Sequence, residues 1–394
     1  MHQIEGGITA PDGFVANGVH CGIKRQRKDL ALVATDRPCA AAGVFTTNKA
    51  AAACVAISKA HLADETAQAI VVTSGNANCC TGERGYEDAM RIVEAIAQAL
   101  GCRPGDVLHA STGPIGKYLP TDAVLDAVPA LVDGASASGA QAAAEAILTT
   151  DTGAKEFACR LAVEGQAITI GAMAKGAGMI EPNMRTMLAF ITTDAVVDRA
   201  FMQRSLQDAA ARTFNRITID GDQSTNDMVL MLANGRAGND EINGDLGAAP
   251  FQEALATTCS ALAKRIVQDG EGATKFIEVV VRGAASDADA EAAARAVANS
   301  TLLKCALHGG SPNWGRVMAA LGASDVTFDV EHVDIALGDV VVMRSGMPAE
   351  HDAARLAEVM AGKEIQVTAS LNEGSGRSVI WTCDLSPEYV KINM

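Results

Sequence analysis

Aromatic and basic residues are scarce in this chain of 394 residues, which has 2 Trp, 3 Tyr and a net charge of −15. Binding to nucleic acid or to an anionic membrane surface requires a basic face, so this charge argues against both. The few aromatic rings also leave few platforms on which bases can stack. We therefore expect neither nucleic acid nor a membrane as the main partner.

Long apolar runs and metal-type cysteine spacings are missing as well. No stretch approaches the roughly 18 apolar residues of a membrane-spanning helix, and the N-terminal segment lacks the regions of a signal peptide. The ten cysteines include no CxxC pair, and no Cys/His spacing typical of zinc occurs. We expect a cytoplasmic protein with reduced thiols and no metal site.

Short β-type runs are mixed with helical patterns along the whole chain. The runs bounded by Gly, Pro, Asn or Asp lie at 30–35, 69–73, 167–171, 277–281 and 339–343. Apolar residues recur with helical spacing at 86–100, 138–148, 198–213, 250–268, 288–304 and 352–361. This mixture predicts an α/β protein, and the length suggests two or three domains. The strands do not alternate cleanly with single helices, so a doubly wound sheet does not follow.

The segment 171–195, GAMAKGAGMIEPNMRTMLAFITTDA, combines Lys175, several glycines, a Pro-Asn turn and then Thr186 before an apolar run. From composition alone, the segment is a turn that leads into a buried strand, and Thr186 is a half-buried residue of that strand, because strands favour threonine. The functional alternative is that Thr186 is a nucleophile. If the chain were cut just before it, the new α-amino group, with an ordinary pKa of roughly 7.7–8.0, would accept the hydroxyl proton.

This segment resembles the cleavage site of the ornithine acetyltransferase family, the ArgJ-type enzymes of arginine biosynthesis. Further motifs of that family occur in order along nearly the whole chain. They are PDGFVANGVHCGIK at 11–24, AAGVFTTNKA at 41–50, IVVTSGNANCCTG at 70–82, STGPIG at 111–116, LTTDTGAKE at 148–156, TFNRITIDGDQSTNDM at 213–228, DGEGATKFIEV at 269–279, SPNWGRVMAALG at 311–322 and CDLSPEYVKIN at 383–393.

The resemblance implies an enzyme that cleaves itself at Arg185–Thr186, giving an alpha chain of residues 1–185 and a beta chain of residues 186–394. Thr186 would then accept acetyl from N2-acetylornithine as an ester and pass it to glutamate. The resemblance therefore implies a glutamate N-acetyltransferase and ornithine acetyltransferase. Bifunctional members also take acetyl from acetyl-CoA. No cofactor or metal is implied, and the two chains are expected to associate as α2β2.

The resemblance also implies roles for individual residues. The Thr112 hydroxyl and the Gly113 backbone N–H match the oxyanion pair, which stabilises the negative oxygen of a tetrahedral intermediate. The positions that match substrate-binding residues are Thr152, Lys175, Thr186, Glu271 and Asn393. Lys175 suits the α-carboxylate of N-acetylornithine, and Glu271 suits its side-chain ammonium.

The fold that the resemblance implies is an αββα-type sandwich with a smaller C-terminal α/β domain from about residue 280. Four features depart from the family pattern, and one of them is Ser311, which stands where an aspartate is usual before PNWGR. Arg185 replaces the usual Ala before the scissile bond, and Pro114 replaces a Val, which removes a donor at 114 but not at 113. The family also usually carries several residues after the position of Asn393, including a hydroxyl residue that helps to bind substrate, whereas this sequence has only Met394 there.

Two other functions are compatible with the same residues. The first is a self-activating N-terminal-Thr amidohydrolase or aminopeptidase, which would pass the acyl group to water. The second is an uncleaved, inactive homologue with a binding role. The first would release acetate without glutamate, and the second would remain a single full-length chain.

Overall fold

The structure is a computed structural model that describes residues 1–181 and 187–394. These residues form two units, of which the first comprises Met1–Asn215 and Asp222–Ile266. The second comprises Arg216–Gly221 and Val267–Met394.

The described residues of the first unit contain nine strands and six α-helices. The strands are β1 (His2–Ile4), β2 (Phe14–Val19), β3 (Leu30–Phe45), β4 (Thr66–Ser74), β5 (Val107–Thr112), β6 (Lys155–Val163), β7 (Gln166–Lys175), β8 (Leu188–Thr193) and β9 (Met228–Ala233). The helices are α1 (Ala53–His61), α2 (Gly82–Leu100), α3 (Thr121–Asp133), α4 (Ala140–Ala146), α5 (Arg199–Arg212) and α6 (Ala248–Gln268), whose last two residues belong to the second unit.

Strand β3 connects two layers of sheet. Its residues Leu30–Ala34 pair with β2 and β4, whereas Ala40–Phe45 pair with β9. The register to β4 shifts between Ala34 and Cys39, and such an irregularity lets a strand bend. One layer therefore holds β2, β4, β5 and the start of β3. The other layer holds β1, β6–β9 and the end of β3.

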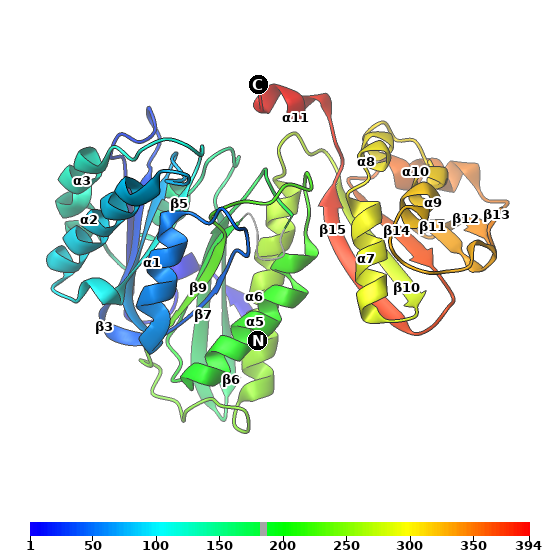
Figure 1. The fold of residues 1–394 in the computed structure, drawn as a ribbon. Helices are drawn as coiled ribbons and strands as arrows, with labels where there is room; N and C mark the ends of the chain where they lie inside the picture. Colours follow the sequence, from blue (N-terminus) through cyan, green and yellow to red (C-terminus); the bar gives the residue numbers. More distant parts are fainter. Residues whose placement is uncertain (182–186) are drawn as a thin grey trace. The chain divides into compact units, whose positions relative to one another are not determined.

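Both faces of the first part of β3 are buried, which explains its unbroken apolar sequence. Ala31 and Val33 belong to the core between the two layers. Leu30 and Leu32 point the other way and pack into a second core with residues of α2 and α3, such as Ile92. Helices α2 and α3 lie outside one layer, and α5 and α6 lie outside the other (Figure 1). This confirms the αββα sandwich.

The strand order places strands from late in the sequence between strands from early in the sequence. The order is β1-β6-β7-β8-β9-β3-β4-β5, so β8 and β9 stand between β7 and β3. Strand β8 is antiparallel to β7 and parallel to β9. Two strands from after residue 186 are thus inserted between strands from before residue 185. The predicted chain boundary between residues 185 and 186 stays a prediction.

The second unit is a sheet covered by helices. Within its described residues the sheet order is β13-β12-β11-β14-β10-β15. Its strands are β10 (Phe276–Ala284), β11 (Asp334–Leu337), β12 (Val340–Arg344), β13 (Met347–Pro348), β14 (Glu364–Ser370) and β15 (Gly376–Cys383). Its helices are α7 (Asp287–Ala298), α8 (Thr301–His308), α9 (Trp314–Gly322), α10 (Ala353–Ala361) and α11 (Pro387–Ile392). The residue predicted as the approximate start of this part, 280, lies inside β10.

The helix expected over 288–304 is wrong in one respect, because two helices occupy that range. Helix α7 ends at Ala298 and α8 begins at Thr301. Ser300 is the N-cap of α8, and its side chain accepts a hydrogen bond from the Leu303 N–H. Serine favours such caps because its hydroxyl competes with backbone partners inside a helix, a local effect that apolar spacing does not register.

Candidate active site

The predicted oxyanion pair lies where β5 ends. The Thr112 carbonyl accepts hydrogen bonds from the N–H groups of Gly75 (2.8 Å) and Asn76 (2.9 Å), which follow the neighbouring parallel strand β4. Gly113 has a φ of 136°, and a Cβ there would lie 2.4 Å from the Asn76 nitrogen. Only glycine therefore fits at 113 without moving the backbone.

Asparagine side chains stiffen the turn beside this pair. The Asn76 side-chain oxygen accepts the Asn78 N–H at 2.7 Å, and its amide nitrogen donates to the Tyr118 carbonyl at 3.0 Å. Asn78, with a φ of 46°, donates to the Gly85 carbonyl at 2.7 Å. Asparagine tolerates this left-handed conformation better than most residues. The backbone next to Thr112 is therefore held by bonds from several segments.

Asn226 connects this turn to the second layer, and sequence reasoning missed it. Its side-chain nitrogen donates to the Ala77 and Ser111 carbonyls, each at 2.8 Å. Asn226 lies two residues before Met228, the first residue of β9. Asn226 lies within the TFNRITIDGDQSTNDM motif at 213–228, and nothing in the spacing of that motif singled it out.

Lys175 ends β7 and meets Thr112 from the other layer. Its Nζ lies 3.4 Å from the Thr112 hydroxyl oxygen and 4.0 Å from Asp151 Oδ2. Lys175 is 7% exposed, so it is a buried lysine at the end of a strand and not a solvated one. The structure thus brings together three of the predicted site residues of the first unit, Thr112, Gly113 and Lys175.

Asp151 is a buried carboxylate beside Lys175 that sequence reasoning did not single out. Its side chain accepts hydrogen bonds at 2.7 Å from Lys155 Nζ and from the Gly176 N–H. Burial opposes its ionisation, but the ammonium groups of Lys175 and Lys155 outweigh that effect and hold the pKa of Asp151 well below its ordinary value. Its neighbour Thr152, a predicted substrate-binding residue, is exposed.

Lys24 lies near the same cluster. Its Nζ donates to the carbonyls of Lys28 (2.9 Å) and Leu148 (2.5 Å), and it thereby holds the segment that leads to Asp151. Burial lowers the pKa of Lys24 to about 8, and the positive charge of Lys175 acts in the same direction, while the carboxylate of Asp29 opposes the shift.

The predicted scissile bond, Arg185–Thr186, lies outside the described residues. The first residue of β8 is Leu188, two positions after Thr186 in the sequence. Leu188 is the register partner of Lys175 on one side and of Met228 on the other. The chain therefore enters the sheet directly beside Lys175, soon after position 186.

The other two predicted site residues lie in the second unit and contact each other. Asn393, the C-cap of α11, donates from its side-chain nitrogen to Glu271 Oε2 at 2.6 Å. The same nitrogen donates to the Tyr389 carbonyl at 3.0 Å. Glu271 is 8% exposed, so it is not a solvated surface carboxylate.

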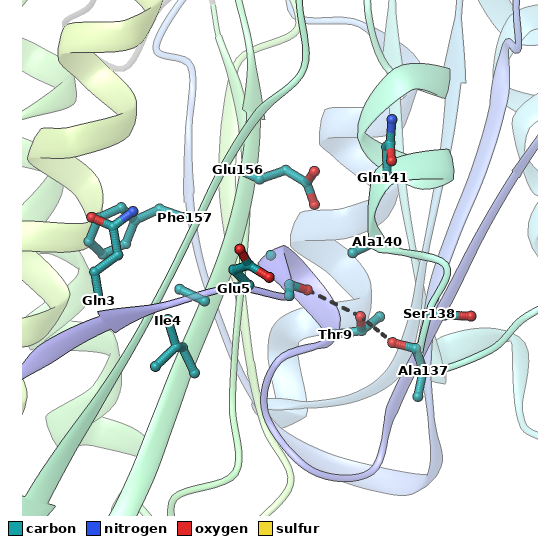
Figure 2. Close-up of a pocket in the computed structure, with 13 residues that line it drawn as sticks. Gln3, Ile4, Glu5, Thr9, Ala137, Ser138, Ala140, Gln141, Glu156 and Phe157 are labelled. Atoms are coloured by element: carbon teal, nitrogen blue, oxygen red, sulfur yellow. Dashed lines mark hydrogen bonds between the residues drawn. The ribbon is translucent and has the colours of Figure 1, made fainter.

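A cavity of about 390 Å³ lies elsewhere in the first unit, between β1, α4 and β6 (Figure 2). Glu5, Glu156 and Gln141 line it, and the Thr9 hydroxyl at its edge donates to the Ala137 carbonyl at 2.7 Å. The thirteen residues drawn in Figure 2 include none of the predicted site residues. This cavity is therefore distinct from the end of β5.

Three further observations concern the described residues as a whole. They contain no group of three or more His, Cys, Asp or Glu side chains arranged to hold a metal ion. All ten cysteines are free thiols. In residues 1–181 and 187–394, no helix has the length and hydropathy needed to cross a membrane.

Comparison with known proteins gives consistent matches over nearly the whole chain. The model of the ArgJ family matches residues 15–394. The chain is 51% identical to the arginine biosynthesis bifunctional protein ArgJ of Symbiobacterium thermophilum, with 100% of this chain and 99% of that protein covered. It is 47% identical to the protein of the same name from Dehalococcoides mccartyi, with 99% and 96% covered.

One solved structure supports the same assignment. The crystal structure of the arginine biosynthesis bifunctional protein ArgJ from Bacillus halodurans is 40% identical, with a TM-score of 0.50. The match covers 51% of this chain and 95% of that chain. Because the family model extends over residues 15–394 and relatives match along the full length, this chain belongs to the ArgJ family.

Proposed function

We propose that this chain is a self-cleaving N-acetyltransferase of arginine biosynthesis, which moves acetyl from N2-acetylornithine to glutamate through an ester on Thr186. The observation that carries the proposal is the meeting of Lys175 with Thr112 and Gly113 in a member of the ArgJ family. These residues provide a cation and two oxyanion donors beside the strand that begins two residues after Thr186.

The first reaction is the cleavage of the chain at Arg185–Thr186. The hydroxyl oxygen of Thr186 attacks the carbonyl carbon of Arg185, and the C–N bond breaks as the acyl group moves to that oxygen. Water then hydrolyses the ester and leaves a carboxylate on Arg185. The α-amino group released on Thr186 has an ordinary pKa of roughly 7.7–8.0, so it serves as the base for the same residue in the later reaction.

Acetyl transfer repeats this chemistry with substrates. The Thr186 oxygen attacks the acetyl carbonyl of N2-acetylornithine, ornithine leaves with the amine, and the amine of glutamate then attacks the ester. Each step passes through a tetrahedral carbon with a negative oxygen. The Thr112 hydroxyl and the Gly113 N–H stabilise that oxygen, and removal of one such donor typically costs about 10²–10³-fold in kcat.

Substrate recognition follows from charge. The ammonium of Lys175 binds the α-carboxylate of the acetylated amino acid, and Thr152, the residue after Asp151, adds a hydroxyl to substrate binding. Glu271 binds the side-chain ammonium of ornithine, and its hydrogen bond from Asn393 orients the carboxylate for that purpose. Acetyl-CoA is a second acetyl donor, and the reaction needs no resident cofactor or metal.

The size of the solved relative supports a chain that is divided in two. Its chain is matched over 95% of its length by only 51% of this chain, so it is about half as long. A product of cleavage near residue 185 has that length, since 394 − 185 = 209 residues remain after the cut. We further propose that the two chains pair as α2β2 and that the enzyme works in the cytoplasm.

The decisive experiment is an intact-mass measurement on freshly purified protein. Two species are expected, and the second should begin Thr-Met-Leu-Ala-Phe. Thr186→Ala should give one full-length species, Thr186→Ser should cleave slowly, and Thr301→Ala, at an exposed threonine, should behave like the parent protein. Persistence of the uncut parent chain through long incubation would contradict self-cleavage.

The acetyl acceptor is tested separately with N2-acetylornithine as donor. N-Acetylglutamate should form only when glutamate is added, and ornithine should accumulate in equal amount. Acetate release at the same rate with and without glutamate would instead indicate an amidohydrolase.

A further inference from the structure

We propose that Asp151 is a positioning residue of this site, whose buried carboxylate holds the ammonium of Lys175 against the hydroxyl of Thr112. The inference rests on the proposed function, because that function gives Thr112 its role as an oxyanion donor. It adds a residue that touches neither substrate nor the reacting atoms.

The geometry places Asp151 at the junction of three segments. Oδ1 accepts hydrogen bonds from Lys155 Nζ in β6 and from the N–H of Gly176, which directly follows β7, both at 2.7 Å. Oδ2 accepts the Thr149 N–H at 3.0 Å and lies 4.0 Å from Lys175 Nζ. The side chain of Asp151 has no exposed surface. Its carboxylate therefore fixes both the end of β7 and the side chain that ends it.

The carboxylate of Asp151 is surrounded by positive charges. Lys155 from β6 and Lys175 from β7 are both almost fully buried and share this one carboxylate. Lys24, beside Arg27 and Asp29, adds positive charge from the segment that follows β2. Removing Asp151 would take a nearby carboxylate away from the buried ammonium of Lys175, and the loss of an opposite charge disfavours the charged form of a buried lysine.

The consequence for catalysis concerns the direction of the Thr112 hydroxyl. A threonine hydroxyl has one proton to donate and two lone pairs that accept. The Lys175 ammonium donates to the Thr112 oxygen at 3.4 Å. While Lys175 is charged and in place, the Thr112 proton is directed away from it and is available to the developing oxyanion. Asp151 thus acts on the reaction through Lys175.

A structural role for Asp151 would have different consequences, and Asp106 provides the matched control. Asp106 is 1% exposed, pairs with Arg103 and directly precedes β5, at the opposite end of that strand from Thr112. Asp151→Asn and Asp106→Asn each remove one buried, paired carboxylate at nearly constant shape. Only the carboxylate of Asp151 faces Lys175.

The first measurement does not depend on activity. In protein labelled with 15N-lysine, the amine signal of Lys175, assigned by its loss in Lys175→Met, is followed against pH. In Asp151→Asn this amine should lose its proton at a lower pH than in the parent protein, and in Asp106→Asn it should not. Lys155→Met removes the ammonium group that donates to Asp151 beside Lys175. This variant should shift the transition of Lys175 to higher pH. Unchanged transitions in both Asp151→Asn and Lys155→Met would overturn the proposal.

The second measurement follows the rates of self-cleavage and of acetyl transfer from pH 6 to pH 9. Asp151→Asn should be about 10- to 100-fold slower than the parent protein near pH 8, less than the loss expected when an oxyanion donor is deleted. The difference should shrink towards pH 6. A difference that stays constant with pH would indicate a structural role alone. If the parent protein neither cleaves nor transfers acetyl, the proposed function fails, and the lysine titration still decides the role of Asp151.

Discussion

Lys175 Nζ donates to the hydroxyl oxygen of Thr112 at 3.4 Å, and this bond joins the ends of two strands that lie in different layers of the sandwich. Strand β5 contributes the oxyanion pair, and β7 contributes the cation. The two residues are 63 positions apart in the sequence. Their meeting depends on the packing of one layer on the other, so the site forms only when the first unit is folded.

The Thr112 hydroxyl can be tested by removing its donor at constant shape. Thr112→Val keeps the volume and loses the proton, so kcat for acetyl transfer should fall about 10²–10³-fold, with a smaller effect on KM. Thr112→Ser restores a hydroxyl and should recover most of the rate. Equal rates for the Val and Ser variants would exclude the hydroxyl as an oxyanion donor.

Gly113 can be tested against Gly116 in the same loop. Both have positive φ, 136° and 79°, so alanine is strained at either position. At 113, however, the new Cβ would also lie 2.4 Å from the Asn76 nitrogen, whereas at 116 nothing lies within 4 Å. Gly113→Ala should slow cleavage and transfer strongly, while Gly116→Ala should lower the melting temperature slightly and retain activity. Similar activities of the two variants would contradict the assigned position of the donor.

Buried His109 should make the folded protein less stable in acid. It is fully buried in β5, its ring nitrogens have no hydrogen-bond partner among the described residues, and burial lowers its pKa to about 4. Between the ordinary pKa of 6.5 and about 4, the unfolded chain binds a proton at this site that the folded chain does not. The free energy of unfolding should therefore fall with decreasing pH, by up to about 1.4 kcal/mol per unit from this residue.

Chemical denaturation at pH 7, 6 and 5 measures this dependence. His109→Leu should show a shallower decline than the parent protein, and His2→Leu, at an exposed histidine, should not. Comparing slopes removes the effect of the substitution on stability at neutral pH. Parallel slopes for His109→Leu and the parent protein would show that His109 does not limit acid stability.

The thiols should divide into two classes by reactivity. Cys80 and Cys305 are exposed, whereas burial raises the pKa of Cys39 and of Cys259 to about 12 and that of Cys54 to about 11. Because the thiolate is the reactive form, iodoacetamide at pH 8 should modify the two exposed residues first. Intact mass after increasing times with iodoacetamide gives the number of modified cysteines. Cys80→Ser should remove one of the fast additions. Rapid modification of Cys39 or Cys259 in the folded protein would contradict the burial.

The two products of cleavage should remain associated. Strands β8 and β9 stand between β7 and β3, so the later fragment is hydrogen-bonded to the earlier one along two edges. Native mass spectrometry and gel filtration should show both fragments in one species, and denaturant should release them together with loss of structure. Separate elution in native buffer would be incompatible with this strand order.

Sequence reasoning was most successful where one local pattern determines structure. Helix α2 covers the predicted range 86–100, and Gly101 ends it with a φ of 70°. The expected strand at 30–35 exists, but β3 continues to Phe45 because its second part pairs with β9, a contact that no local pattern encodes. The boundary between α7 and α8 depends on a serine cap that apolar spacing does not register.

The same distinction applies to the site. The resemblance to a family identified Thr112, Gly113 and Lys175, and the structure brings them together. Asp151 and Asn226 were not singled out, although both lie within the motifs that carry the resemblance. Their importance comes from partners on distant segments, such as Gly176 for Asp151 and Ser111 for Asn226. Burial and pairing of this kind arise from tertiary packing.

The insertion of β8 and β9 between strands of the earlier segment also bears on how the protein responds to denaturation. Before the cut, refolding is a first-order process within one polypeptide. After it, the sheet can be rebuilt only when two separate molecules meet, so recovery becomes second-order and slows on dilution. Maturation at Arg185–Thr186 would thus convert a reversible folding equilibrium into a kinetically maintained state, in which the lifetime of the enzyme is set by its rate of unfolding.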